Sequence, residues 1–182
     1  MRLGGDAPNF VAFSTFDEES IKHQITYYHN PSRWESYQLP LNSPLRNIDN
    51  WSEEIKYYNS DGTDYSDEIG QLPTTTGGVY VFYLKGDNLP FFENYILYIG
   101  RCRFTENGQN ICKRAKEYIS DARESVSYMM SHWKNHLYYR FFPDTDNPRI
   151  DANEALLIRA IVPPFNEVIP NICNPQEPIP AF

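Results

Sequence analysis

Two short runs of β-branched and aromatic residues constrain the fold of this chain more than any other feature. The runs Val79–Leu84 and Tyr95–Gly100 each have the length of one buried strand and are too short for an ordinary helix. A Lys-Gly-Asp-Asn turn signal at residues 85–88 separates them. The two runs therefore predict a β-hairpin with a longer connection than usual.

Helical patterns follow the hairpin. Apolar residues recur at helical spacing from Asn110 to about Glu124, and a second helical stretch covers about Val126–Asn135. Leu137–Phe142 then has the composition of a third strand. This order predicts an α+β fold, with a small central antiparallel or mixed sheet of about three strands flanked by helices.

The last predicted helix has the clearest boundaries. Asp151 is the expected N-cap, Ala152–Val162 form the helix, and the double proline Pro163-Pro164 ends it. Asp151 and Glu154 also have the spacing of a capping box. Glu154 therefore has a purely structural candidate role, which is to bond the helix start.

Residues 1–72 show no clean period and carry prolines at positions 31, 40 and 44. A helix start is expected at Asn50, with the helix leading into Glu54–Tyr58, and Ser60–Asp67 is expected to be a flexible acidic approach to the next unit. The sequence thus predicts two parts: an N-terminal accessory or arm segment over 1–72, and a main domain with a proline-rich tail over 73–182.

The charge is uneven along the chain, whose formal net charge is −8. Residues 1–72 hold 5 basic and 12 acidic side chains, whereas residues 101–149 hold 9 basic and 6 acidic ones. A nucleic-acid partner needs Lys and Arg at its phosphates. The overall acidity therefore neither supports nor excludes DNA, and the later part of the chain has enough basic residues for one positive face.

Cysteine usage and hydropathy bear on the compartment. The three cysteines are odd in number and fit no paired disulfide framework. The first residues lack the apolar run of a signal peptide, and no stretch has the roughly 20 apolar residues that cross a bilayer. These observations predict a soluble, cytoplasmic protein with no membrane partner.

An ordered set of polar residues lies on the predicted elements. Gly78-Val79-Tyr80 and Tyr98-Ile99-Gly100 occupy the two hairpin strands, and Arg114 precedes Tyr118 by one helical turn. Glu154 lies on the last helix, and Asn166 follows it by 12 positions. This set resembles the GIY-YIG nuclease superfamily over roughly residues 77–170, with Val79 in place of the middle Ile. The long hairpin connection, the long segment before Arg114 and Tyr rather than His at 118 are most similar to its restriction endonucleases.

The resemblance implies a catalytic domain over 73–182 that hydrolyses phosphodiester bonds with a divalent cation. Glu154 would be the metal ligand, for Mg²⁺ or Mn²⁺, because these hard cations prefer carboxylate and water oxygens. Arg114 would bind the scissile phosphate in a charge-assisted fork. Tyr80 would take the proton from the attacking water, helped by a neighbouring phenol, cation or metal because a free phenol has a pKa near 10.

The remaining candidates have supporting roles. Tyr98 would stabilise the Tyr80 phenolate, Tyr118 would bond a phosphate oxygen or the water, and Asn166 would brace the site. The candidate DNA-binding residues are Arg101, Arg103, Lys113, Lys116 and Lys134.

Structural alternatives apply to each candidate. The tyrosines are also ordinary strand aromatics, and Arg114 with its neighbouring lysines is also a solvated helix face. His132 and His136 have i, i+4 spacing but lack the Glu of an HExxH zinc site, so a DNA-facing or solvated surface is the favoured interpretation.

The leading functional hypothesis is a type II-like restriction enzyme that cuts double-stranded DNA. The alternatives are a structure-specific or repair nuclease, and a catalytically silent DNA-binding regulatory module. Two cuts in a duplex would suit a homodimer. The acidic segment 1–72 would serve as a recognition arm or dimer contact, or would mask the basic face.

Overall fold

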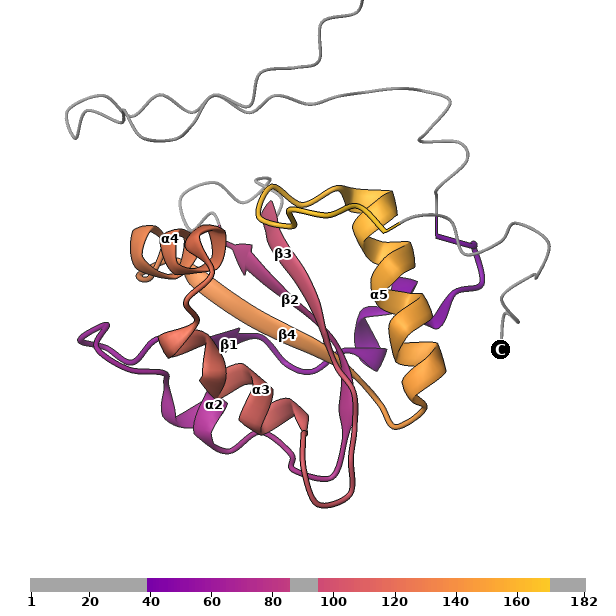
Figure 1. The fold of residues 1–182 in the computed structure, drawn as a ribbon, viewed down its shortest axis with the longest axis horizontal. Coiled ribbons are helices and arrows are strands. Elements are labelled where there is room, and N and C mark those ends of the chain that lie inside the picture. The colour runs from indigo at the N-terminus through magenta and orange to yellow at the C-terminus, as the bar shows by residue number, and fades with distance from the viewer. Residues whose placement is uncertain (1–38, 86–94, 171–182) are drawn as a thin grey trace, which may run out of the picture. The chain divides into compact units, whose positions relative to one another are not determined.

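The computed structural model describes residues 39–85 and 95–170 (Figure 1). The described residues lie in one compact unit. The described elements, in chain order, are the 3-10 helices η1 (Pro44–Arg46) and η2 (Ile48–Asn50), strand β1 (Ile55–Lys56), helix α2 (Asp67–Gly70), strands β2 (Gly77–Leu84) and β3 (Tyr95–Cys102), helix α3 (Ile111–Glu117), 3-10 helix η3 (Tyr118–Ser120), helix α4 (Glu124–His132), strand β4 (Leu137–Asp144) and helix α5 (Asn147–Ile161).

The sheet is antiparallel and has the strand order β1-β4-β2-β3. The expected α+β fold is confirmed, and the three predicted strands are β2, β3 and β4. The fourth strand, β1, has only two residues and pairs with β4 through Ile55 and Tyr139. The helix expected from Asn50 is wrong, because Asn50 ends η2 and the following residues turn into β1.

Alternation along β2 separates the two faces of the sheet, and both faces are covered. Tyr80 and Phe82 belong to a core shared with α2, α3 and α4, whereas Val79 and Val81 pack with α5. Figure 1 shows α5 on one side of the strands and α2, α3 and α4 on the other. Burial on both faces explains why the run Val79–Leu84 is continuously apolar and aromatic rather than alternating.

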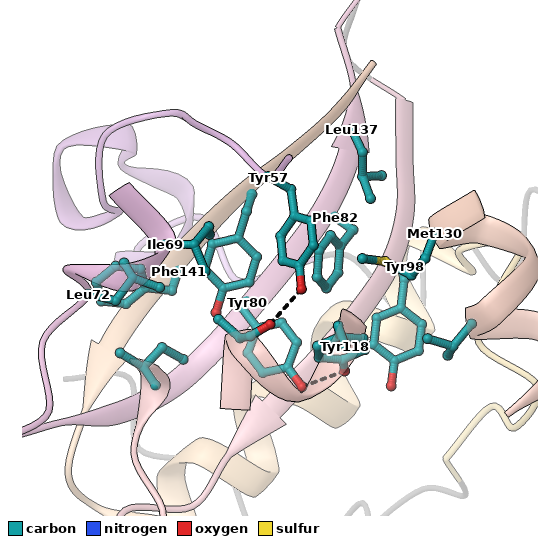
Figure 2. Packing of buried hydrophobic residues seen from close by; sticks show 14 of the residues in the cluster. Tyr57, Ile69, Leu72, Tyr80, Phe82, Tyr98, Tyr118, Met130, Leu137 and Phe141 are labelled. Carbon is teal, nitrogen blue, oxygen red and sulfur yellow. Dashed lines mark hydrogen bonds between the residues drawn. The ribbon is translucent and has the colours of Figure 1, made fainter. Parts of the chain in front are cut away.

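The face toward α3 is an aromatic cluster (Figure 2). The Phe82 ring contacts the rings of Tyr118 and Tyr57 at centroid distances of 4.8 and 5.2 Å, both edge to face. Tyr57 is fully buried and donates its hydroxyl to the Ala115 carbonyl oxygen at 2.8 Å. Among the described residues, the buried Tyr139 hydroxyl has no hydrogen-bond partner. Much of the tyrosine content of this chain therefore forms its core.

Part of the segment that the sequence assigns to an accessory arm packs into this core. Tyr57, Ile69 and Leu72 are buried in the same cluster as Tyr80. The acidic stretch at 60–67 is an ordered turn here, in which Asp61 accepts from Thr63. Residues 1–38 lie outside the described residues, and the division of the chain at residue 72 stays a prediction.

Helix α5 begins earlier than predicted, and this changes the role of Asp151. Asp146, not Asp151, is the N-cap, and its side chain accepts from the Arg149 amide at 3.3 Å. Pro148 lies in the first turn, a position where its missing N–H costs nothing. The predicted N-cap at Asp151 is therefore wrong, and Glu154 lies in the helix body rather than at its start. The end of α5 at Ile161, before the double proline, agrees with the prediction.

The two middle helices are shorter than predicted. α3 ends at Glu117, and Tyr118 begins a 3-10 turn that breaks before α4. α4 ends at His132, so His136 does not share its helical face. No helix in the described parts of the chain is long and apolar enough to span a membrane.

Candidate active site

A pocket of about 400 Å³ lies beside β3, the edge strand of the sheet. Four of the predicted catalytic residues, from four different elements, line it: Tyr80 of β2, Tyr98 of β3, Arg114 of α3 and Glu154 of α5. Helices α3 and α5 pack on opposite faces of the sheet, and side chains from both line this pocket. The other lining residues are Arg101, Cys102, Arg103, Thr105, Gln109 and Arg123.

Two glycines of the sequence triplets are needed for close approach. Gly100 is paired with Tyr80 across β2 and β3, and a Cβ at Gly100 would lie 2.6 Å from the Tyr80 hydroxyl oxygen. Gly78 has a φ of 139°, and a Cβ there would lie 2.0 Å from the Phe142 carbonyl oxygen. Only glycine leaves room for the Tyr80 phenol beside β3.

The Tyr80 hydroxyl lies at the centre of a buried hydrogen-bond network. It lies 2.7 Å from the Tyr118 hydroxyl, and Arg114 Nε donates to it at 3.1 Å (the Tyr80–Tyr118 bond is drawn in Figure 2). Arg114 Nη1 also donates to the Glu117 carboxylate at 2.9 Å. Tyr118 therefore contacts the pocket through Tyr80 rather than lining it.

Burial raises the pKa of Tyr80 well above that of a free phenol, although the Arg114 charge acts in the opposite direction. A guanidinium has only donors, so the Tyr80 oxygen accepts from Arg114 and keeps its own proton for another acceptor. Tyr80 is thus a neutral phenol whose conjugate base a neighbouring cation would stabilise.

Tyr98 has a guanidinium of its own. Arg123 Nη1 donates to the Tyr98 hydroxyl at 3.2 Å, and the guanidinium carbon lies 5.7 Å from the Tyr98 ring centroid. By the same donor argument, the Tyr98 hydroxyl proton is directed away from Arg123. Both strand phenols therefore line one pocket, and each accepts a hydrogen bond from a guanidinium.

Glu154 faces the pocket from α5 and pairs with Arg101, the residue directly after the Tyr98-Ile99-Gly100 triplet. Arg101 Nη1 donates to Glu154 Oε2, and Arg101 Nε lies 3.0 Å from an Asp151 carboxylate oxygen. Arg103 Nε donates to the same Asp151 carboxylate at 2.9 Å. The Asp151 side chain, free of a capping role, therefore holds both arginines at the pocket.

The Glu154 carboxylate fits a hard cation. Its side chain is 14% exposed, and no described residue donates to its second oxygen, Oε1. Burial raises the pKa of the Glu154 carboxyl above its usual value, although Arg101 acts in the opposite direction. No group of three or more His, Cys, Asp or Glu side chains within residues 39–85 and 95–170 is arranged to hold a metal. Water and phosphate oxygens would complete the shell, as is common for Mg²⁺.

Asn166 lies outside the pocket, at the outer edge of β3. Its Oδ1 accepts from the Ile99 amide at 2.9 Å, and its Nδ2 donates to the Ile99 carbonyl oxygen at 2.8 Å. The side-chain amide thereby bonds both groups of an edge strand that would otherwise lack partners. Asn166 fixes the strand that carries Tyr98 and Gly100.

Three of the candidate DNA-binding residues are not brought to the pocket. Lys134 donates to the Gly62 carbonyl oxygen at 2.9 Å, and the Lys116 ammonium lies 5.5 Å from the Tyr65 ring centroid. Lys113 is exposed on α3. Arg101 and Arg103 do line the pocket, so the basic surface there consists of arginines, which suit bidentate phosphate contacts.

Two residues of the site are not among the predicted ones: Arg123, and Asp151 as a partner of arginines. Arg123 precedes α4 in a turn outside the ordered set, and no spacing rule singles it out. The spacing of Asp151 to Glu154 matches a capping box, and this pattern predicts an N-cap rather than a partner for arginines. The proline at 148, which is typical of a first helical turn, was the signal for the earlier start.

Comparisons with known proteins give one structural likeness. No family model and no curated protein matches the chain. A matching solved structure is the GIY-YIG N-terminal endonuclease domain of UvrC from Thermotoga maritima, as a point mutant bound to the catalytic divalent cation. The match has 18% identity and a TM-score of 0.39, and covers 60% of this chain and 99% of that domain.

Proposed function

We propose that this chain is a GIY-YIG endonuclease that hydrolyses phosphodiester bonds of double-stranded DNA with a divalent cation. One observation carries the proposal. Two strand phenols, a helix guanidinium and a distant carboxylate, which the sequence places on four elements, line a single pocket. Their order along the chain alone does not require them to meet.

The chemistry of the lining side chains supports phosphoryl transfer. A phosphodiester repels nucleophiles, so hydrolysis needs its charge neutralised and its attacking water activated. Arg114 would bind the scissile phosphate, because its guanidinium lines the pocket and is fixed by Tyr80 and Glu117. The pocket holds four guanidiniums and one carboxylate, a balance that suits an anionic ligand.

Tyr80 would take the proton of the attacking water. It can do so only as a phenolate, so its own proton must first leave to solvent. Arg114 donates to the Tyr80 oxygen and would stabilise that phenolate, whose charge is neutralised when it takes the proton of the water. Tyr98 would donate its O–H to a phosphate oxygen, since Arg123 already occupies its acceptor side. Tyr118 and Asn166 would act as positioning residues, the first through Tyr80 and the second through β3.

Glu154 would hold Mg²⁺ or Mn²⁺ through its carboxylate, as the only acidic residue that lines the pocket among the described residues. When bound, such a cation neutralises charge on the phosphate and favours deprotonation of water. Arg101 pairs with Glu154 in this structure. With a cation on Glu154, Arg101 would be released to contact a phosphate, and its pair with Asp151 would keep it near the pocket.

The test is a digest of a long sequenced duplex by the purified chain, with and without Mg²⁺, followed by mapping of the ends. Discrete fragments with a common end sequence would support a restriction-like enzyme, and the separation of the two nicks would show whether a homodimer cuts both strands. Selective cutting of branched or flapped oligonucleotides would favour a repair nuclease instead. Binding of DNA without any cleavage would overturn the enzyme assignment and leave a silent binding module.

A further inference from the structure

Arg123 reaches the pocket from the turn between η3 and α4. Its side chain is 44% exposed, and it lines the same pocket as Arg114 and Glu154. The guanidinium is therefore accessible to a ligand there, and a ligand bound to Tyr98 would also meet Arg123, because the two side chains are hydrogen-bonded.

The Arg123 guanidinium is held in one orientation before any ligand binds. Its Nε and Nη2 donate to the two oxygens of Asp121, at 2.9 and 2.7 Å, and its Nη1 donates to the Tyr98 hydroxyl at 3.2 Å. These bonds do not use all five N–H groups of an arginine. A fork fixed in this way loses little further freedom on binding, which favours affinity.

Arg123 and Arg114 have matching surroundings. Their guanidinium carbons lie 5.9 and 5.0 Å from the centroid of the same Tyr118 ring. Each donates to one strand phenol, and each pairs with a carboxylate that does not line the pocket, Asp121 for Arg123 and Glu117 for Arg114. The acidic partners therefore lie outside the pocket, whereas the two guanidiniums line it.

We propose that Arg123 is a DNA-contacting residue, whose guanidinium binds a backbone phosphate next to the one bound by Arg114. This inference rests on the proposed nuclease function. On the opposite flank of the pocket, Arg101 and Arg103 are held by Asp151. A strand crossing the pocket would therefore meet arginines on both sides of the cleaved bond, and Arg123 marks the path on the α4 side.

The test measures duplex binding against salt concentration in EDTA, for the wild-type chain and for Arg123→Gln and Arg123→Lys. Each phosphate contact contributes about 0.9 to the slope of log K against log salt. Arg123→Gln is expected to lower that slope by about 1 and the affinity by about tenfold. Arg123→Lys is expected to keep the slope but to cleave more slowly, because lysine cannot both pair with Asp121 and reach Tyr98. The control is Arg46→Gln, an exposed arginine away from the pocket, which should keep the wild-type slope.

A wild-type slope in Arg123→Gln, in a chain that otherwise binds and cleaves DNA, would overturn the inference and leave the proposed function standing. Absence of both binding and cleavage in the wild-type chain would overturn both. A second measurement does not depend on variant folding. Duplex DNA should protect Arg123, but not Arg46, from an arginine-modifying dicarbonyl reagent, and equal modification of Arg123 with and without DNA would contradict the proposal.

Discussion

Tyr80 has a packing role through its ring and a proposed chemical role through its hydroxyl, which bonds Tyr118 and Arg114. The ring is fully buried between Tyr118 and Tyr139, at centroid distances of 5.8 and 5.6 Å, yet the side chain also lines the pocket. A strand aromatic needs no hydroxyl for packing. The hydroxyl of Tyr80 is therefore the part of the residue whose removal separates the structural role from the proposed catalytic one.

Replacing Tyr80 by phenylalanine is expected to lower the cleavage rate by about 10²–10⁴-fold, the usual contribution of a general base. The fold should persist, at a cost of about 1–3 kcal/mol, because Arg114 and Tyr118 lose a buried partner. Plasmid nicking rates and urea denaturation measure the two effects.

Tyr83→Phe is the matched control, since it removes a hydroxyl from the same strand on the opposite face, where it bonds Glu54. It should leave cleavage unchanged. Near-wild-type cleavage by Tyr80→Phe would exclude Tyr80 as the base.

At the scale of elements, the β2–β3 pair fixes the site through Gly100. A methyl group at Gly100 would lie 2.6–2.7 Å from the Tyr80 hydroxyl and ring atoms, so the ring must move. We expect Gly100→Ala to reduce cleavage by about 10²-fold, as misplacement of a catalytic group by about 1 Å does, and to destabilise the fold by about 1–3 kcal/mol.

Gly70→Ala provides the comparison, because its added methyl group would meet only the Tyr65 ring at 3.7 Å. The same rate assay and a thermal melt apply to both variants. Equal activities for the two would mean that the glycine of the second triplet has no part in placing Tyr80.

The start of α5 depends on an ion pair whose strength varies with pH. Burial alone would raise the pKa of Asp144, but hydrogen bonds from Arg149 and from backbone amides outweigh it and hold that pKa below its usual value. A depressed carboxyl pKa stabilises the fold above the unfolded value of about 4 and loses this effect as the pH falls through the folded value.

Arg149→Gln should therefore destabilise the chain most at neutral pH, by about 1–3 kcal/mol, because Asp144 is 3% exposed and would keep an unpaired charge. The loss should shrink as the pH falls below about 4 and through the lowered folded pKa of Asp144, where the carboxyl takes up a proton. Urea denaturation at the two pH values measures this difference. A loss of equal size at both would show that the pair is not the cause.

The elements differ in how far the sequence could predict them, for physical reasons. β2, β3 and β4 were predictable because strands of eight residues with β-branched and aromatic side chains have a strong local signal. β1 was not, since two residues have no period and form a strand only by pairing with β4. Two polar patterns predict a start for α5: Asp151 with Glu154 at capping-box spacing, and Asp146 followed by Pro148. The helix begins at the second of these, earlier than predicted.

The candidate site was predictable in its members but not in its support. Tyr80, Tyr98, Arg114 and Glu154 were recognised by their order along the chain. The carboxylates that hold the arginines, Asp121, Glu117 and Asp151, come from turns and helix positions whose proximity arises only in the folded chain. Partners of this kind have no signature in one sequence.

At the scale of the whole molecule, residues 39–72 belong to the folded unit. A chain that begins at residue 73 would lack β1 and α2, together with the buried side chains of Tyr57, Ile69 and Leu72. Each such side chain stabilises a fold by about 1.5–3 kcal/mol, so the loss is a large share of the roughly 5–15 kcal/mol of a typical domain. Circular dichroism and thermal melting of this truncated chain should show no cooperative transition.

Deletion of residues 1–30, which lie outside the described residues, should keep the cooperative transition, because the described core side chains all remain. In that chain, tighter DNA binding would indicate that residues 1–30 mask the basic pocket, whereas loss of sequence preference would indicate that they form a recognition arm. A cooperative melt of the chain that begins at residue 73 would contradict the role assigned to residues 39–72.

The most direct measurement of the central claim is cleavage of a supercoiled plasmid in Mg²⁺ or Mn²⁺ by the wild-type chain and by Glu154→Gln. Glu68→Gln is the control, because Glu68 is an exposed carboxylate of α2 that does not line the pocket. The wild-type and control chains should cleave and should stop in EDTA, whereas Glu154→Gln should lose at least about 10³-fold in rate while keeping its fold and its DNA binding. Metal-dependent cleavage by Glu154→Gln at the wild-type rate would contradict the assignment of this pocket as the active site.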